Sequence, residues 1–285
     1  MKKRPNTAKS WKNPLFVENA GTRHVAEALR LGERLRRKAA RGLALGTFVI
    51  ELPAPATLST LALAGFDFVV LDLEHSAIDF SRLEQLIFAA HAAGLPALVR
   101  TWGEDTGRIG KVLDMGANGI MAPHVDTPQR ARAIVEQARF APLGHRGFSP
   151  LTQFDALREP LRTLSQTAFV VIQIEGRKAL DRVSQIAAVP GIDSVFVGPY
   201  DLALSLDVTP GSPQVFAAAE RVRAAVPEDV GMGIYLDDPA KSGTWAARGF
   251  SLQCVSFDGR MLAKGARAIV DEARRSAPKR RGRRS

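Results

Sequence analysis

The stretch FDFVVLDLEH, residues 66–75, decides how the rest of this 285-residue chain is interpreted. Its apolar run, residues 68–71, has the length and the β-branched content of a buried parallel strand. The run then ends abruptly in Asp72, Glu74 and His75. Three titratable groups directly after so apolar a strand indicate that this end of the strand faces a functional site.

Strand-like and helix-like segments alternate along the remainder of the chain. The expected strands cover residues 43–50, 66–73, 96–100, 119–122, 169–174, 194–197, 230–235 and 252–257. The expected helices cover residues 56–64, 79–93, 107–115, 127–138, 179–187, 213–225, 238–247 and 261–276. An alternation of about 25 to 30 residues per unit predicts an α/β fold, a (β/α)8 barrel rather than an open sheet.

Charge and composition divide the chain into three parts. Residues 1–38 carry a net charge of +8 and residues 277–285 carry +5, so the body between them has −3 of the total of +10. We expect a basic N-terminal extension over 1–38, partly disordered or helical, a barrel over 39–276, and a basic disordered tail over 277–285. The ends lack the interleaved aromatic and basic residues of nucleic-acid contacts, which argues against nucleic acid as a partner.

Several classes of protein are disfavoured by what the sequence lacks. There is no apolar run of about 18 residues, and the N-terminus is too basic for a secretory signal, so we expect a cytoplasmic protein without a membrane segment. The single cysteine, Cys254, excludes an intrachain disulfide framework and a cysteine cluster for zinc. No G-x-G-x-x-G follows the first expected strand, so a dinucleotide-binding fold loses its main support.

In barrels of this kind the chemistry gathers at the carboxyl ends of the strands, because the loops converge there over a rigid floor. The residues at those positions with polar or turn chemistry are Asp72, Glu74, His75, Arg100, Pro123, His124, Gln173, Glu175, Gly198, Pro199, Tyr200, Asp201 and Asp258. The opposite ends of the strands hold no comparable set. The candidate site is therefore built from these residues.

Two of these residues are candidates for metal ligands. Glu175 and Asp201 follow neighbouring strands, and no pair of histidines lies beside them in the sequence. An oxygen-only ligand set of this kind suits Mg²⁺ or Mn²⁺, which usually keep waters that a substrate can displace. The alternative is that the two carboxylates form salt bridges with Arg100 or Arg177.

His75 and Arg100 are candidates for catalysis. Asp72 lies three residues before His75 near the same rim, and an Asp–His dyad would fix the imidazole tautomer and raise its basicity for work as a general base. A lone histidine at a strand end can equally be a hydrogen-bonded structural residue. Arg100 could hold a carboxylate or stabilise an enolate through charged hydrogen bonds.

Five short motifs in register resemble one known family. They are L-D-x-E-H at residues 71–75, V-R at 99–100, R-G at 146–147, Q-I-E at 173–175 and G-P-x-D at 198–201. Their order and spacing, over residues 43 to 269, are similar to those of the HpcH/HpaI family of class II pyruvate aldolases. Members of this kind include the 4-hydroxy-2-oxoheptanedioate and 2-dehydro-3-deoxyglucarate aldolases.

The resemblance implies a (β/α)8 barrel whose last helix packs on a neighbouring subunit of a homo-oligomer, a trimer or a hexamer. It implies that Glu175 and Asp201 hold Mg²⁺, Mn²⁺ or Co²⁺, and that Arg100 stabilises the enolate oxygen while the His75–Asp72 dyad moves the proton. The substrate-binding residues that it implies are Arg100, Gln173, Gly198, Pro199, Tyr200 and Asp105, the last on a loop that can reach an adjacent subunit's site.

The reaction that the resemblance implies is the reversible retro-aldol cleavage of a 4-hydroxy-2-oxo acid, with dicarboxylates among the candidate substrates, to pyruvate and an aldehyde. A dication with an arginine stabilises the enolate, and a histidine takes the hydroxyl proton. No lysine follows an expected strand, which argues against a Schiff base. Tyr200 and Asp207 depart from the family pattern, where several members have a small residue and a glycine.

Two alternative functions stay open. An acyl-CoA lyase of the malyl or citramalyl type shares the barrel and the carboxylate pair, although D-x-E-H favours the aldolases that act on free acids. A barrel without catalytic activity, whose basic ends bind RNA or another anion, would explain the charge of the ends.

Overall fold

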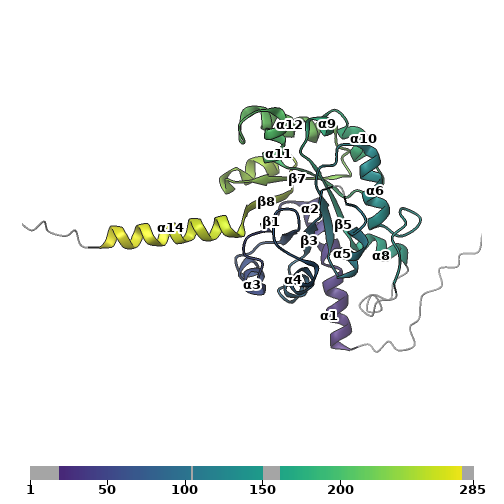
Figure 1. Ribbon diagram of the computed structural model, residues 1–285, viewed down its shortest axis with the longest axis horizontal. Coiled ribbons are helices and arrows are strands. Elements are labelled where there is room, and N and C mark those ends of the chain that lie inside the picture. Colours follow the sequence, from purple (N-terminus) through teal and green to yellow (C-terminus); the bar gives the residue numbers. More distant parts are fainter. Residues whose placement is uncertain (1–18, 104, 150–160, 278–285) are drawn as a thin grey trace, which may run out of the picture.

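The computed structural model describes residues 19–103, 105–149 and 161–277 as a closed barrel of parallel strands surrounded by helices (Figure 1). The strands are β1 (Ala44–Val49), β2 (Phe68–Asp72), β3 (Ala97–Arg100), β4 (Gly119–Ala122), β5 (Phe169–Ile174), β6 (Ser194–Val197), β7 (Gly231–Leu236) and β8 (Leu252–Phe257). Each pairs with its neighbours in the sequence, and β1 closes the barrel against β8. The predicted (β/α)8 barrel is confirmed.

The barrel interior is filled by large apolar side chains, so the barrel is a packed core and not a pore. Phe68, Phe169 and Phe196 lie inside and are at most 2% exposed. A Cβ at Gly46 would lie 2.4 Å from the ring of Phe68, and a Cβ at Gly233 would lie 2.4 Å from the ring of Phe196. The absence of a side chain at these two strand positions makes room for the aromatic rings.

The helices lie outside the barrel. They are α1 (Ala20–Leu29), α2 (Leu31–Arg41), α3 (Pro55–Leu63), α4 (Phe80–Ala92), α5 (Ile109–Asp114), α6 (Pro128–Ala138), α8 (Leu161–Thr167), α9 (Arg177–Leu180), α10 (Val183–Ala187), α11 (Pro199–Leu206), α12 (Pro213–Ala225), the 3₁₀ helix η1 (Pro239–Lys241), α13 (Ser242–Ala247) and α14 (Asp258–Ser276). Asp79 caps α4 and Thr127 caps α6, each accepting a hydrogen bond from a backbone N–H of the first turn.

Helices α1 and α2 cover the amino end of the barrel. Arg36 of α2 donates hydrogen bonds to the carbonyl of Ala168, just before β5, and to Asp193, just before β6. Asn118, just before β4, donates to the carbonyl of Ala28 at 2.8 Å. Because these helices close the amino end, the carboxyl end is the open one, where the candidate residues were expected.

The structure differs from the predicted elements in a few places. The N-terminal extension over 1–38, expected to be partly disordered or helical, contains α1 and most of α2 within its described residues, and the helix predicted over 179–187 is the pair α9 and α10. The connection after β6 contains α11, which the sequence did not predict, and α11 ends at Asp207 in the left-handed conformation with φ 59°. A glycine is favoured at such a position, which accounts for the family pattern from which Asp207 departs. The predicted loop over 140–160 lies partly outside the described residues, as do 1–18 and 278–285 of the two basic ends.

Helix α14 extends away from the barrel (Figure 1). Asp258, its first residue, is its only buried one, and Leu262, Ile269 and Val270 are 60%, 72% and 42% exposed. None of the helices in the described ranges is long and apolar enough to cross a membrane.

Candidate active site

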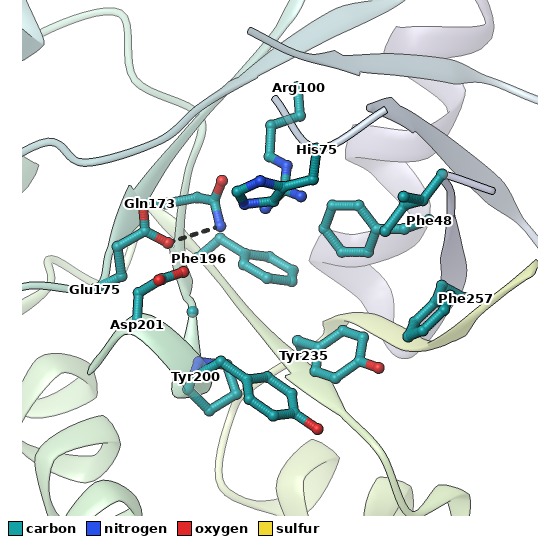
Figure 2. Close-up of a pocket in the computed structure, with 13 residues that line it drawn as sticks. Phe48, His75, Arg100, Gln173, Glu175, Phe196, Tyr200, Asp201, Tyr235 and Phe257 are labelled. Carbon is teal, nitrogen blue, oxygen red and sulfur yellow. Dashed lines mark hydrogen bonds between the residues drawn. The ribbon is translucent and has the colours of Figure 1, made fainter. Parts of the chain in front are cut away.

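A pocket of about 270 Å³ opens at the carboxyl end of the barrel (Figure 2). Of the residues that the sequence singled out, His75, Arg100, Gln173, Glu175, Gly198, Pro199, Tyr200 and Asp201 line it. Phe48, Ile50, Phe196, Tyr235 and Phe257 form its apolar walls. The ends of β2, β3, β5 and β6 therefore bring most of the predicted site residues together, whereas Asp72, Asp105 and Asp258 are not part of the lining.

Asp72 pairs with Arg100, and not with the imidazole of His75 as predicted. The Asp72 carboxylate is fully buried and accepts hydrogen bonds from Nε and Nη2 of Arg100, both at 2.7 Å. Its contact with His75 is to the backbone N–H, at 3.3 Å. Asp72 and Arg100 are partners in the strand register, so their side chains leave the sheet side by side. The predicted dyad is therefore wrong in this structure, and Asp72 orients the guanidinium instead.

Arg100 is held on three sides and presents one part of its guanidinium to the pocket. Its Nη1 lies 3.4 Å from Glu74, and its guanidinium lies 4.8 Å from the centre of the Phe48 ring. Burial lowers the pKa of Arg100, but the hydrogen bond and charge of Asp72 and the nearby carboxylates raise it above its usual value overall. Arg100 is thus a fixed, permanently charged donor at the wall of the pocket.

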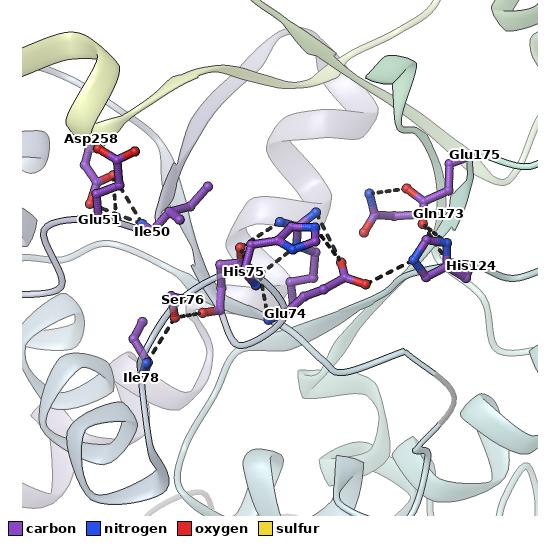
Figure 3. Close-up of polar contacts among 12 residues, drawn as sticks. Ile50, Glu51, Glu74, His75, Ser76, Ile78, His124, Gln173, Glu175 and Asp258 are labelled. Atoms are coloured by element: carbon purple, nitrogen blue, oxygen red, sulfur yellow. Dashed lines mark hydrogen bonds and ion pairs between the residues drawn. The ribbon is translucent and has the colours of Figure 1, made fainter. Parts of the chain in front are cut away.

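His75 reaches the pocket from the loop after β2. Its side chain is 59% exposed, and its Nε2 lies 3.7 Å from Glu74. Glu74 also lies 3.1 Å from Nε2 of His124, so this carboxylate stands between both histidines and Arg100 (Figure 3). Glu74 itself does not line the pocket.

His124 belongs to the network around the pocket, a role that the sequence reasoning did not assign. It contacts Glu175 twice, through its backbone N–H at 2.7 Å and through Nδ1 at 3.1 Å. Its backbone has φ 55°, a left-handed conformation that side chains rarely adopt. Its position after β4, between the strands that carry Arg100 and Glu175, had made it a candidate in the sequence, but without a role.

Glu175 is buried among other charges. It is 3% exposed, and a Cβ at Gly198 would lie only 2.4 Å from its Oε2, so a side chain at position 198 would displace the carboxylate of Glu175. Burial and the charges of Asp201 and Glu74 raise the pKa of Glu175 to about 7, although the hydrogen bond and charge of His124 lower it. Two carboxylates this close in a buried site favour a cation between them.

The donor set fits a divalent metal ion. In Figure 2 the carboxylates of Glu175 and Asp201 lie side by side next to Gln173. Gln173 donates to Glu175 at 3.1 Å, while its buried Oε1 has no hydrogen-bond partner among the described residues. Within the same residues, no cluster of three or more His, Cys, Asp or Glu side chains suits a metal. An ion held by Glu175 and Asp201 would therefore share its coordination with water or substrate oxygens.

Asp105 and Asp258 lie away from the pocket. Asp105, on the loop between β3 and α5, accepts a hydrogen bond from the backbone of Gly107 at 2.9 Å and pairs with Arg108 at 3.3 Å. Asp258 accepts backbone hydrogen bonds from Ile50 and Leu52, which anchors the loop after β1 to the start of α14 (Figure 3). Asp258 is thus a structural residue.

Comparisons with known proteins identify the family of the chain. Residues 45–265 match the family model described as HpcH/HpaI aldolase/citrate lyase. A hydroxypyruvate/pyruvate aldolase from Rhizorhabdus wittichii is 34% identical over 79% of this chain and 92% of the relative. A crystal structure of an HpcH/HpaI aldolase/citrate lyase family protein from Burkholderia cenocepacia is 32% identical, with a TM-score of 0.77 over 86% of this chain and 98% of the other.

The fold alone does not determine the substrate. The crystal structure of the citrate synthase SbnG also has a TM-score of 0.77, with 29% identity over 87% of this chain and 98% of the other. Different reactions are thus carried by closely similar barrels, and the side chains of the pocket have to distinguish them. The match of the family model and of the aldolase relative shows that this chain belongs to the HpcH/HpaI aldolase/citrate lyase family and is a carbon–carbon lyase.

Proposed function

We propose that this enzyme cleaves a 4-hydroxy-2-oxo acid reversibly to pyruvate and an aldehyde, with a divalent metal ion held by Glu175 and Asp201. The observation that carries the proposal is the arrangement of one pocket: Arg100, fixed by Asp72, lies on one wall, and the two carboxylates lie on another. A fixed cation and two carboxylates around one small volume support the proposal, because the enolate of a 2-oxo acid requires positive charge close to its oxygens. When bound, the metal ion supplies Lewis acidity to the 2-oxo acid.

The residues of the chain divide the chemical steps between them. In the cleavage direction, the C4 hydroxyl loses its proton, the C3–C4 bond breaks, the aldehyde leaves, and the electron pair remains as an enolate over C2 and C3. His75, the exposed imidazole at the pocket, takes the hydroxyl proton. Arg100 donates hydrogen bonds to the enolate oxygen at C2, and His75 then returns the proton that it took from the hydroxyl to C3, which gives pyruvate. Gln173 and Glu175 are both buried, and the hydrogen bond between them holds their side chains in place at this wall of the pocket.

Metal removal tests the proposal. Dialysis against EDTA should abolish the condensation of pyruvate with glyceraldehyde, read by mass spectrometry, and Mg²⁺ or Mn²⁺ should restore it. Glu175→Ala should lose Mn²⁺ binding in calorimetry, because one of the two carboxylates is gone, whereas Glu84→Ala, on the exposed face of α4, should keep it. Activity that survives thorough chelation would contradict the proposal. Saturable cleavage of a malyl-CoA thioester without pyruvate condensation would favour the acyl-CoA lyase instead.

A further inference from the structure

Four side chains form a polar cluster at one edge of the pocket, which we call the rim cluster: Tyr200, Tyr235, Asp237 and Arg260. Asp237 accepts a hydrogen bond from the hydroxyl of Tyr235 at 3.0 Å and another from the hydroxyl of Tyr200. Arg260 forms an ion pair with Asp237 and donates to the hydroxyl of Tyr200 at 3.3 Å. Residues from α11, the end of β7 and α14 are thus joined into one network.

The rim cluster borders the part of the pocket that the pyruvate chemistry does not use. Tyr200 and Tyr235 line the pocket, and their rings lie 5.9 Å apart. In Figure 2 their hydroxyl groups point away from the carboxylates of Glu175 and Asp201. Arg260 lies over the ring of Phe257, another lining residue, at 4.9 Å. A molecule whose 2-oxo acid end is held by Arg100 and the carboxylates would extend its other end toward these hydroxyls.

The charge of the rim cluster is already balanced. The cation of Arg260 is paired with Asp237, and the charge of Glu51 acts on the same guanidinium. Lys241 of η1 follows Asp237 closely in the sequence, and its ammonium group lies 5.1 Å from the centre of the Phe216 ring. Two carboxylates around one arginine offer hydrogen-bond acceptors and donors, but they give no net attraction for an anion.

We propose that the rim cluster is the subsite for the aldehyde half of the substrate and selects a short, uncharged hydroxyaldehyde over one that carries a carboxylate. The hydroxyls of such an aldehyde match the two phenols, which donate and accept, and Asp237, which accepts, whereas a second carboxylate is repelled by the charges of Asp237 and Glu51. This inference rests on the proposed function and refines it, because it disfavours the dicarboxylate substrate. The cleaved 2-oxo acid would then carry further hydroxyl groups beyond C4.

The test compares aldehydes of similar size in condensation with pyruvate and Mn²⁺. The wild type should show a kcat/KM for glyceraldehyde at least about tenfold above that for succinic semialdehyde, the effect of about one charged contact. Asp237→Asn should reduce this ratio about tenfold by raising kcat/KM for succinic semialdehyde, since Arg260, which lies over the lining residue Phe257, then lacks its main counterion. Tyr235→Phe should raise the KM for glyceraldehyde and leave that for propionaldehyde, which has no hydroxyls, unchanged.

Asp238→Asn is the matched control. It removes the same charge one residue away, but the Asp238 side chain accepts from the backbone of Ala240 at 3.0 Å and is not part of the rim cluster. The ratio of the two aldehydes should stay as in the wild type. An equal change in Asp238→Asn and Asp237→Asn, or a wild type that prefers succinic semialdehyde, would overturn the assignment of the subsite.

A half-reaction separates failure of the subsite from failure of the proposed function. The exchange of pyruvate C3 protons in D₂O, followed by proton NMR, needs the Arg100 side of the pocket but no aldehyde. Exchange in the wild type and in Asp237→Asn at similar rates, with the altered aldehyde ratio, supports the subsite. Normal exchange with an unaltered ratio overturns the subsite alone, and absence of exchange in the wild type overturns the proposed function as well.

Discussion

At the scale of single residues, we expect Asp72 and His75 to have separable roles, although the sequence predicted that they act as one unit. His75→Ala should slow pyruvate C3 exchange by about 10²-fold or more, the usual contribution of a general base, and leave pyruvate binding intact. Because the His75 side chain is 59% exposed, the folded protein should be hardly affected. The measurements are the NMR exchange rate and the Kd of pyruvate by calorimetry in the presence of Mn²⁺.

A second variant, Asp72→Asn, tests whether Asp72 orients Arg100. It leaves Arg100 without its bidentate partner in a fully buried position, so pyruvate should bind more weakly and the free energy of unfolding should fall by up to about 3–5 kcal/mol. If Asp72→Asn weakens pyruvate binding while His75→Ala slows only the exchange, the orientation of Arg100 and the proton transfer are separate roles. A fall in the exchange rate with unchanged pyruvate Kd and stability, as for His75→Ala, would restore the dyad.

The sequence predicts which residues reach the site better than it predicts their partners. The rule that chemistry lies at the carboxyl ends of strands places Arg100, Gln173 and Glu175 in one pocket, as the structure does. The spacing of Asp72 and His75 suggests a local pair, but the neighbouring strand supplies Arg100 at the register position beside Asp72. The partner of a buried carboxylate depends on how neighbouring strands are aligned. The sequence of one strand does not specify this alignment.

At the scale of elements, His91 of α4 forms part of a buried junction at the amino end of the barrel. Its Nε2 lies 3.0 Å from Oδ1 of Asn118, which also accepts from the backbone N–H of Ala97 at 2.9 Å. Burial and the charge of His24 lower the pKa of His91 from 6.5, although the hydrogen bond to Asn118 raises it. The unfolded chain therefore takes up a proton at this residue at a higher pH than the folded protein does.

The sign of the resulting pH dependence follows from that difference. The stabilising contribution of neutral His91 is present above the unfolded pKa of 6.5 and decreases as the pH falls through it, because protonation then favours unfolding. His91→Gln keeps a donor toward Asn118 and removes the titration, so its Tm should fall less than the wild-type Tm between about pH 8 and pH 5.5. His145→Gln, at an exposed loop position, should follow the wild type. A wild-type slope in His91→Gln would contradict this account.

Helices and strands are predicted well where apolar residues recur with a clear period. They are predicted poorly where tertiary contacts or caps determine where an element begins and ends. The predicted strands 119–122 and 194–197 coincide with β4 and β6. Helix α11 was read as a connection because it is short and starts at Pro199, yet a proline at the first helical position is favourable. The α1–α2 boundary lies next to Gly32, where a Cβ would lie 2.3 Å from the carbonyl oxygen of Asn118. Such a close approach depends on the assembled barrel.

At the scale of the whole molecule, α14 has an apolar face that the other described residues, 19–103, 105–149 and 161–257, do not cover. Leu262 and Ile269 lie seven residues apart on one face and are 60% and 72% exposed, and the helix extends away from the barrel (Figure 1). A single chain would leave this face in water at a cost that grows with the apolar area exposed. We therefore expect a second copy of the chain to cover it, in line with the homo-oligomer that the family resemblance implies.

Replacing the apolar pair tests this expectation. Leu262→Ser combined with Ile269→Ser should reduce the molar mass of the particle in size-exclusion chromatography with light scattering, because the face that joins the copies loses its apolar area. Lys264→Ser combined with Asp271→Ser changes two exposed positions at the same spacing on the opposite face without altering the net charge, and it should keep the wild-type mass. Pyruvate C3 exchange reports separately whether each variant keeps a folded pocket. A monomeric wild type, or an unchanged mass after the apolar pair is replaced, would show that α14 does not hold copies of this chain together.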